Sequence, residues 1–298
     1  MSPRTKIGVL GIGAIGTVMA YQLQRLPSHD MFYFSRTKKK TLKLIVESQP
    51  FDIPVVSKTT SETLKLDWLF ICIKEHQYQE AKHWFSKLIS PSTKVVVIRN
   101  GLNLKEPLLD FSNEDQILEC LIDCPTERDK KGYYNCIKMP KLIVPKSDLA
   151  SEFETLFNRS GIEITQSNDF KTDAWKKLLE SATLGAVLCI YNRTCEIFQL
   201  SIAKHLYRNL MEESIKVAKA DGAKIEENFT DKMINKLMNY PKTKGSSMLT
   251  DLRQGKPLEL GAKNGIISKL GKQYGIETSI NDWMIRILAK TKIESNLS

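Results

Sequence analysis

Short apolar runs recur along the first half of the chain, and they predict β-strands. They lie at residues 6–10, 31–34, 67–73, 94–99, 116–122, 141–144 and 162–165. Between these runs, apolar residues at helical spacing predict helices after the first strand, at 78–88 and at 149–157. A further helix is predicted after the second strand, through Leu42, Leu44 and Ile45. Strands that alternate with helices favour a doubly wound, largely parallel α/β sheet.

From about residue 170 the chain shows only helical periodicity. Apolar residues at helical spacing recur over 174–189, 202–220, 229–238, 260–274 and 280–289, and no run in this half is typical of a strand. A polar stretch around Asn168 separates the two patterns. The sequence therefore predicts an α/β domain over residues 1–168 and an all-helical domain over residues 169–298.

The composition is that of an ordinary globular protein, with 298 residues, 42% of them hydrophobic and 26% charged. The longest apolar runs fall far short of the roughly 20 residues that a membrane-spanning helix needs. The N-terminus lacks the apolar region of a secretory signal, so a cytoplasmic protein is expected. The 6 cysteines and 4 histidines contain no pair of CxxC motifs, so no metal site is expected.

The formal net charge of +10 favours an anionic partner, such as a nucleic acid, an anionic membrane surface or a phosphorylated cofactor. One compact basic run is present, Arg36 to Lys40, and no nucleic-acid recognition module accompanies it. We therefore expect a small phosphorylated ligand near Arg36, and neither a nucleic acid nor a membrane as partner.

The sequence GIGAIG lies between the first predicted strand and the first predicted helix. It fits the GxGxxG pattern of dinucleotide-binding domains, in which the glycines allow a tight turn, backbone approach to a pyrophosphate and close packing of helix on strand. The free amides at the start of that helix favour phosphate binding. The alternative is an ordinary glycine turn. We predict that the cofactor contacts this turn, formed by Gly11, Ile12, Gly13, Ala14, Ile15 and Gly16.

The end of the second predicted strand bears on the choice of cofactor. An NAD site usually presents an Asp or Glu there to bind the ribose 2′-hydroxyl, whereas this chain has Ser35 and Arg36. A hydroxyl and a guanidinium suit a 2′-phosphate. We therefore predict NADP(H) as the cofactor, with Arg36 as the main 2′-phosphate ligand and Lys38 as a candidate second ligand. The alternative is a solvated basic loop without a ligand.

Polar residues also follow two later strands. Lys74 comes after the strand predicted at 67–73, and Asn100 comes after the strand at 94–99. Ligands of open α/β sheets bind outside the carboxyl ends of the strands, so both side chains are candidates for the cofactor site. Their alternatives are a surface lysine and a turn-forming Asn-Gly pair.

The order of several short motifs resembles the ketopantoate reductase (2-dehydropantoate 2-reductase) family over nearly the whole chain. The motifs are GIGAIG at 11–16, CIK at 72–74, RNG at 99–101, AWKKL at 174–178, SSMLTDL at 246–252 and LELGAKNG at 258–265. The resemblance implies a Rossmann domain followed by a helical domain related to that of 6-phosphogluconate dehydrogenase. It also implies an active site in the cleft between them, where NADPH donates hydride and ketopantoate is reduced to pantoate for pantothenate and coenzyme A biosynthesis.

The same resemblance implies roles for individual residues. Lys177 matches the catalytic lysine, and Glu259 matches a glutamate that binds the substrate during catalysis. Lys74 and Asn100 match residues near the nicotinamide, with Asn100 also a substrate contact, and Ser247 matches a ligand of the substrate carboxylate. Chemistry also favours a lysine, because hydride transfer to a ketone leaves negative charge on oxygen. Without the resemblance, Lys177 is a surface lysine and Glu259 a member of an exposed i,i+4 ion pair.

The chain departs from the family on one helix face. Helical spacing puts Lys177, Ser181 and Gly185 on that face, where the family commonly presents asparagines at the last two positions. Ser181 keeps a hydroxyl for the substrate, whereas Gly185 has no side chain. Two alternatives stay open: a relative that reduces another small 2-oxo acid, and a non-catalytic NADP(H)-binding sensor. A homodimer is a further expectation for such a helical domain.

Overall fold

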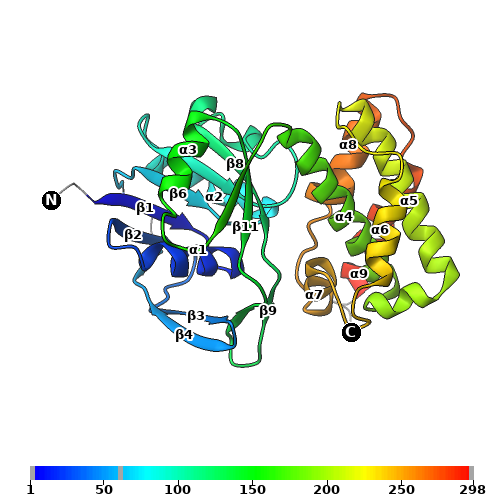
Figure 1. The fold of residues 1–298 in the computed structure, drawn as a ribbon, viewed down its shortest axis with the longest axis horizontal. Helices are drawn as coiled ribbons and strands as arrows, with labels where there is room; N and C mark the ends of the chain where they lie inside the picture. The colour runs from blue at the N-terminus through cyan, green and yellow to red at the C-terminus, as the bar shows by residue number, and fades with distance from the viewer. Residues whose placement is uncertain (1–3, 60–62, 295–298) are drawn as a thin grey trace. The chain divides into compact units, whose positions relative to one another are not determined.

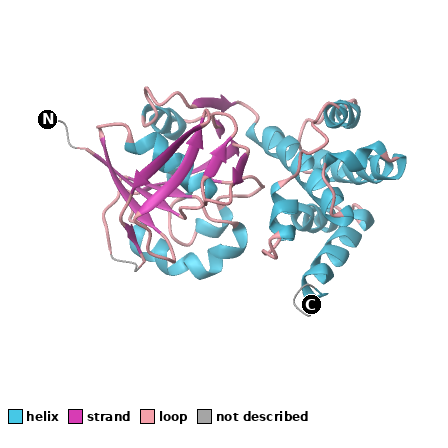
Figure 2. Ribbon diagram, turned by 90° about the horizontal axis from the view of Figure 1, so that it is seen from below, coloured by secondary structure: helices cyan, strands magenta, loops and turns pink. Residues whose placement is uncertain are grey.

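The computed structural model of the protein describes residues 4–59 and 63–294, and the chain divides into two units, residues 1–170 and 171–298. Strands form the centre of the first unit, whereas the described part of the second unit is helical (Figure 1 and Figure 2). The predicted fold class, an α/β domain followed by a helical domain, is confirmed. None of the described helices is both long and apolar enough to cross a membrane.

The main sheet of the first unit has eight described strands. In spatial order they are β12 (Glu163–Ser167), β11 (Lys141–Pro145), β8 (Ile117–Asp123), β7 (Lys94–Ile98), β6 (Trp68–Ile71), β1 (Thr5–Leu10), β2 (His29–Phe34) and β5 (Ser57–Lys58). Neighbouring strands are parallel except for β8 and β11. The order reverses between β1 and β6, which is the place where doubly wound sheets bind their ligands.

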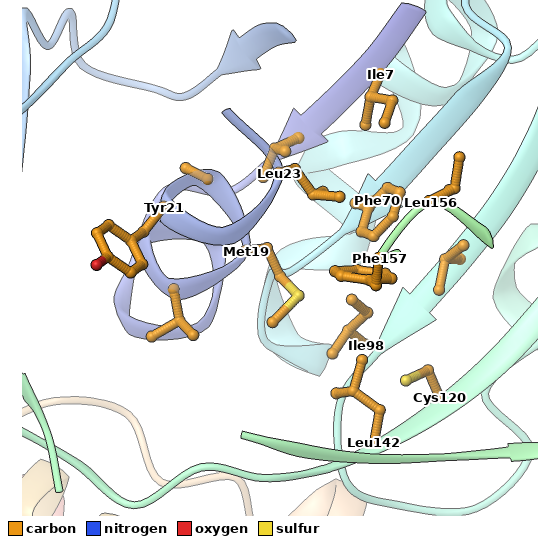
Figure 3. Close-up of a cluster of buried hydrophobic side chains, with 14 of the residues drawn as sticks. Ile7, Met19, Tyr21, Leu23, Phe70, Ile98, Cys120, Leu142, Leu156 and Phe157 are labelled. Carbon is orange, nitrogen blue, oxygen red and sulfur yellow. The ribbon is translucent and has the colours of Figure 1, made fainter. Parts of the chain in front are cut away.

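Helices cover both faces of this sheet, which is why its central strands are nearly continuous apolar runs. On one face lie α1 (Ala14–Gln24) and α3 (Asp148–Thr155), where Met19, Phe70 and Phe157 belong to one apolar cluster (Figure 3). On the other face, the ring of Trp84 in α2 (Tyr78–Leu88) lies 5.6 Å from the ring of Phe34. The sheet is therefore the middle of three layers.

The prediction of a helix through residues 42–45 is wrong, because this segment is a strand in a second sheet. The four strands of that sheet lie in the order β4 (Gln49–Pro54), β3 (Thr41–Val46), β10 (Tyr134–Cys136) and β9 (Thr126–Arg128). The prediction also missed the other three strands of this sheet, β4, β9 and β10.

A period of two explains why this segment is a strand. Leu42 and Leu44 are buried, and the residues on either side of each are more exposed. Glu47 and Ser48 then form a two-residue turn, with φ angles of 49° and 65°. Such left-handed turns match the twist of an antiparallel hairpin, so β3 returns directly into β4.

The predicted helical regions of the second unit are confirmed among the described residues. They are α4 (Phe170–Tyr191), α5 (Ser201–Ala220), α6 (Phe229–Met238), α8 (Ile266–Gln273) and α9 (Ser279–Glu294). The structure adds α7 (Ser247–Arg253), which the sequence pattern did not predict. It also has a π-helical turn, Gly261–Gly265, immediately before α8. Turns of this kind are frequent at functional sites.

Candidate functional site

The glycine turn lies between β1 and α1, beside the point where the strand order reverses. Gly11 has a φ of +91°, and a Cβ there would overlap the side chain of Ile73. A Cβ at Gly16 would overlap the carbonyl oxygen of Gly11. Both positions therefore require glycine for the fold itself, one for a tight turn and one for close packing of α1 on the turn.

Gly13 differs from these two glycines. A Cβ at Gly13 would have no atom within 4 Å, so the protein leaves space above this residue. Gly13 is also the N-cap of α1, where no side chain caps the helix and no acidic residue lies in the first turn. The first amides of α1 thus remain available, and the helix dipole favours an anion there. The turn fits a bound pyrophosphate.

Ser35 and Arg36 follow β2 at the same edge of the sheet. The hydroxyl of Ser35 donates a hydrogen bond to the carbonyl oxygen of Thr37 at 2.8 Å. The guanidinium of Arg36 lies 3.4 Å from the carboxylate of Glu80, and the two side chains are 72% and 69% exposed. An ion pair this exposed contributes at most about 1 kcal/mol, so a phosphate could take the place of the carboxylate.

Lys39, which the sequence analysis did not single out, connects this segment to the glycine turn. Its ammonium donates a hydrogen bond to the carbonyl oxygen of Ile12 at 3.0 Å. Burial lowers the pKa of Lys39, and the charge of Arg128 lowers it further. The basic run 36–40 was the available signal, but only the fold shows which of its lysines reaches the turn. Lys38 is exposed.

Lys74 and Asn100 follow the carboxyl ends of β6 and β7. The strands β1, β6 and β7 are parallel neighbours, so the fold brings both residues to the same edge of the sheet as the glycine turn. Lys74 is half-buried, and its backbone amide donates to Oε1 of Gln77 at 3.0 Å. Asn100 is exposed, and its Oδ1 accepts a hydrogen bond from the amide of Ile122 at 3.4 Å.

In the second unit, α4 carries two adjacent half-buried lysines next to a buried tryptophan. Trp175 is fully buried, and its indole nitrogen donates to Oδ2 of Asp221 at 2.7 Å. The ammonium of Lys176 pairs with Oε1 of Glu226 at 2.7 Å. Lys177, one position further round the helix, is half-buried. The buried tryptophan thus fixes the rotation of α4 and with it the direction of Lys177.

Ser181 and Gly185 share a face of α4 with Lys177. The hydroxyl of Ser181 donates to the carbonyl oxygen of Leu178 at 3.3 Å, which leaves its lone pairs as acceptors. Gly185 is buried, and a Cβ there would lie 3.2 Å from Sδ of Met248 and 3.8 Å from Nζ of Lys263. Residues from two other segments therefore fill the space that a side chain at this position would take.

The two remaining predicted residues lie near the ends of α7. Ser247 is its exposed first residue, and the hydroxyl of Ser246 caps the helix by accepting from the amide of Leu249 at 3.1 Å. Glu259 is half-buried and lies in the segment before the π-helical turn. Because Glu259 is outside the helix, the helical i,i+4 geometry with Lys263 that the sequence analysis considered does not apply.

Two buried charges in the second unit were not predicted as site residues. Asp251 is 7% exposed and Lys263 is 8% exposed. Both lie inside motifs that the sequence analysis used, SSMLTDL and LELGAKNG, but nothing in the sequence shows that they are buried. Among the described residues, no group of three or more His, Cys, Asp or Glu side chains is arranged to hold a metal ion.

These features define a class of protein. The first unit is a Rossmann-type domain with a GxGxxG turn at the reversal of its strand order, and the second is a helical domain with a half-buried lysine on its first long helix. This combination is typical of two-domain oxidoreductases that use a nicotinamide cofactor.

Comparison with known proteins gives the family. Residues 7–146 match the model described as ketopantoate reductase PanE/ApbA, and residues 169–292 match the model of its C-terminal domain. The chain is 26% identical to the 2-dehydropantoate 2-reductase of Mycobacterium tuberculosis over 288 residues, which covers 96% of this chain and 97% of that protein. The protein belongs to the ketopantoate reductase PanE/ApbA family and is therefore an oxidoreductase with a nicotinamide cofactor.

Solved structures share the whole fold. A dimeric ketopantoate reductase from Staphylococcus aureus is 22% identical, with a TM-score of 0.85 over 97% of this chain and 99% of that one. A D-mandelate dehydrogenase, solved with NADH and anilino(oxo)acetate, is 18% identical, with a TM-score of 0.87 over 98% of this chain and 99% of that one. One fold thus occurs in proteins named for different substrates.

Proposed function

We propose that this protein uses NADPH to reduce a small 2-oxo acid, and that its substrate is ketopantoate, which it converts to pantoate. The observation that carries the proposal is the open space over Gly13 at the start of α1, because a dinucleotide needs that space for its pyrophosphate. The names of the relatives support the substrate. The reaction would serve pantothenate and coenzyme A biosynthesis.

The residues of the first unit fit such a cofactor. The glycine turn and the free amides of α1 suit the pyrophosphate. Ser35 and Arg36 suit a 2′-phosphate, and β2 ends without the carboxylate that would repel it. Lys74 and Asn100 are proposed to lie near the nicotinamide. When bound, NADPH supplies a hydride to the keto carbon of the substrate.

Lys177 is the proposed catalytic residue. Its ammonium donates a hydrogen bond to the keto oxygen, stabilises the negative charge that develops there, and gives that oxygen its proton. Water then returns a proton to the lysine. Glu259 accepts a hydrogen bond from the substrate hydroxyl, Ser247 donates one to the substrate carboxylate, and Ser181 offers its hydroxyl on the same helix face as Lys177.

NADPH oxidation, measured with ketopantoate and with a panel of other 2-oxo acids, tests the reaction. We expect ketopantoate to give the highest kcat/KM. Lys177→Ala should lower kcat by about 100- to 10,000-fold, the usual contribution of general acid catalysis. Lys176→Ala is the matched control, because its partner is the exposed Glu226, and it should retain wild-type activity. Equal activity of the two variants would rule out the role proposed for Lys177.

The ratio of kcat/KM for NADPH to that for NADH tests the cofactor. Arg36→Glu puts a carboxylate where the 2′-phosphate is proposed to lie, and it should lower this ratio by at least about 10-fold, the effect of one lost charge-assisted hydrogen bond and an added repulsion. Lys40→Glu makes the same change of net charge at an exposed position of the basic run and should leave the ratio unchanged. An unchanged ratio in Arg36→Glu would exclude Arg36 as the ligand.

A different 2-oxo acid is the second candidate, because Ser181 and Gly185 replace the usual asparagines of the substrate face. The D-mandelate dehydrogenase shows that this fold accommodates an aromatic oxo acid analogue. Turnover of phenylglyoxylate, but not of ketopantoate, would favour this candidate. NADPH binding without turnover of any 2-oxo acid would instead favour a non-catalytic sensor.

A homodimer is the proposed assembly, and the dimeric state named for the Staphylococcus aureus protein supports it. Light scattering combined with size-exclusion chromatography would measure the mass of the particle. A mass equal to one chain at micromolar concentration would contradict the proposal.

A further inference from the structure

Two residues from other segments, Met248 and the cation Lys263, approach the bare position on the substrate face of α4. The proposed face carries Lys177, Ser181 and Gly185, at intervals of one helical turn. At Gly185 a Cβ would lie 3.8 Å from Nζ of Lys263. The amide atoms of an asparagine lie two bonds beyond its Cβ. The ammonium of Lys263 therefore lies in the region that an asparagine amide would reach from this position.

The π-helical turn fixes the place of Lys263. The amide of Gly265 donates to the carbonyl oxygen of Leu260 at 2.7 Å, which closes the wide turn. A Cβ at Gly265 would lie 2.9 Å from that oxygen, so this position suits glycine. Between Lys263 and Gly265, the side-chain Nδ2 of the fully buried Asn264 donates to Oδ1 of Asn281 at 2.9 Å. The backbone on both sides of Lys263 is thus held.

Lys263 also approaches the stretch of α4 that the segment containing Ser247 contacts. Ser247 is the residue that the family resemblance gives as a carboxylate ligand, and the next residue, Met248, is the one that packs against Gly185. Met248 and Lys263 both approach Gly185, so the segment that carries Ser247 and the turn that carries Lys263 meet α4 at the same residue. A neutral hydroxyl alone is a weak ligand for a carboxylate, whereas an ammonium supplies the opposite charge.

Asp251 shares this region with Lys263. The thiol of Cys189, one turn after Gly185 on α4, interacts electrostatically with both charges and with Arg253. Buried charges in proteins are usually compensated by a charge of opposite sign, and Asp251 is of the sign that Lys263 needs. An ammonium has three donors and can bind more than one acceptor.

We propose that Lys263 is a substrate-binding residue whose ammonium holds the carboxylate of the 2-oxo acid and replaces the amide that α4 lacks at Gly185. This assignment rests on the proposed function, because it concerns the same site. In a 2-oxo acid the carboxylate is attached to the reacting carbonyl carbon. Lys177 therefore acts on the keto oxygen, and Lys263 fixes the adjacent anionic group.

The test compares an acid with its uncharged ester. The probes are ketopantoate and ketopantoate methyl ester, assayed by NADPH oxidation with wild type and Lys263→Gln. We expect KM for the acid to rise about 10- to 100-fold, as for a lost charge-assisted hydrogen bond, with a smaller change in kcat. KM for the ester should change by less than about 2-fold, and Lys263→Arg should restore most of the affinity for the acid.

A double variant separates substrate binding from folding. If Lys263 only neutralises Asp251, the variant Asp251→Asn/Lys263→Gln removes both charges and should recover wild-type KM values. Under our proposal, it recovers the thermal stability that Lys263→Gln loses, and its KM for the acid stays high. Equal effects of Lys263→Gln on acid and ester, or a wild-type KM for the acid in the double variant, would overturn the proposal.

Binding measurements distinguish this failure from a failure of the proposed function. Isothermal titration of the NADP⁺ complex with pantoate reports carboxylate binding without turnover. We expect Lys263→Gln to weaken pantoate binding about 10- to 100-fold. Absence of pantoate binding and of turnover in the wild type would refute the substrate and this role together. Wild-type turnover with unweakened pantoate binding in the variant would refute the role of Lys263 alone.

Discussion

Replacing Gly13 by alanine should separate cofactor binding from folding. A methyl group there would meet no atom within 4 Å, and the backbone is extended, with φ of −80° and ψ of −151°. Gly13→Ala should therefore change the free energy of unfolding by less than about 1 kcal/mol. The same methyl group would occupy the space over the first amides of α1. We expect a loss of about 1.5–3 kcal/mol in NADPH binding, or roughly a 10- to 100-fold higher Kd.

Gly16 provides the matched control in the same turn. A methyl group at Gly16 would overlap the carbonyl oxygen of Gly11, and this backbone atom cannot move without displacing the end of β1. Overpacking of this kind costs about 3 kcal/mol, which lowers the Tm of a domain of this size by roughly 6–12 °C. Gly16→Ala should therefore lose stability, whereas Gly13→Ala should lose affinity.

Two measurements distinguish these effects. Thermal unfolding without cofactor, followed by circular dichroism, reports the stability of each variant, and isothermal titration with NADPH reports affinity. If Gly13→Ala binds NADPH as tightly as the wild type, the pyrophosphate does not lie against this turn, and the placement of the cofactor is refuted. If Gly16→Ala unfolds at the wild-type temperature, the packing argument for that glycine is refuted.

Three further predictions concern residues around the site. Burial lowers the pKa of His29, so protonation of this residue favours the unfolded chain. The free energy of unfolding should therefore fall as the pH drops from 6.5 to the lower folded-state pKa. Chemical denaturation at pH 7.5 and at pH 5 should show a smaller loss of stability in His29→Asn than in the wild type. Asp221→Ala leaves a buried indole donor unpaired and should cost about 1–3 kcal/mol, measured by urea unfolding, whereas Glu226→Ala should cost less than about 1 kcal/mol. Lys39→Met removes the hydrogen bond to the glycine turn and should raise the Kd for NADPH several-fold, and an equal rise in Lys40→Met would contradict this.

The fold was largely predictable because its elements follow local patterns. The bounds of α2, Tyr78–Leu88, equal the predicted ones, since Trp84, Phe85 and Leu88 lie on one buried face of an otherwise polar segment. The helix prediction for residues 42–45 was wrong because a short apolar run fits a strand and a helix equally well. Its partner strand β4 and its contacts with α1 decided between the two.

The sequence also determined part of the site. GxGxxG specifies a backbone shape, and the structure gives Gly11 and Gly16 the packing positions that this pattern requires. The motif order identified the family, whose models match residues 7–146 and 169–292. Both depend on residues that are neighbours along the chain or on their order, which the sequence carries directly.

Only the tertiary structure decided which distant residues meet. Lys39 lies among four other residues of a basic run, and its hydrogen bond to Ile12 depends on the path of the chain after β2. Lys263 and Gly185 are far apart in the sequence, and their approach depends on where the packing of the π-helical turn against α8 and α9 places Lys263. Periodicity reports which face of an element is apolar, but the packing of several elements determines which side chains that face contacts.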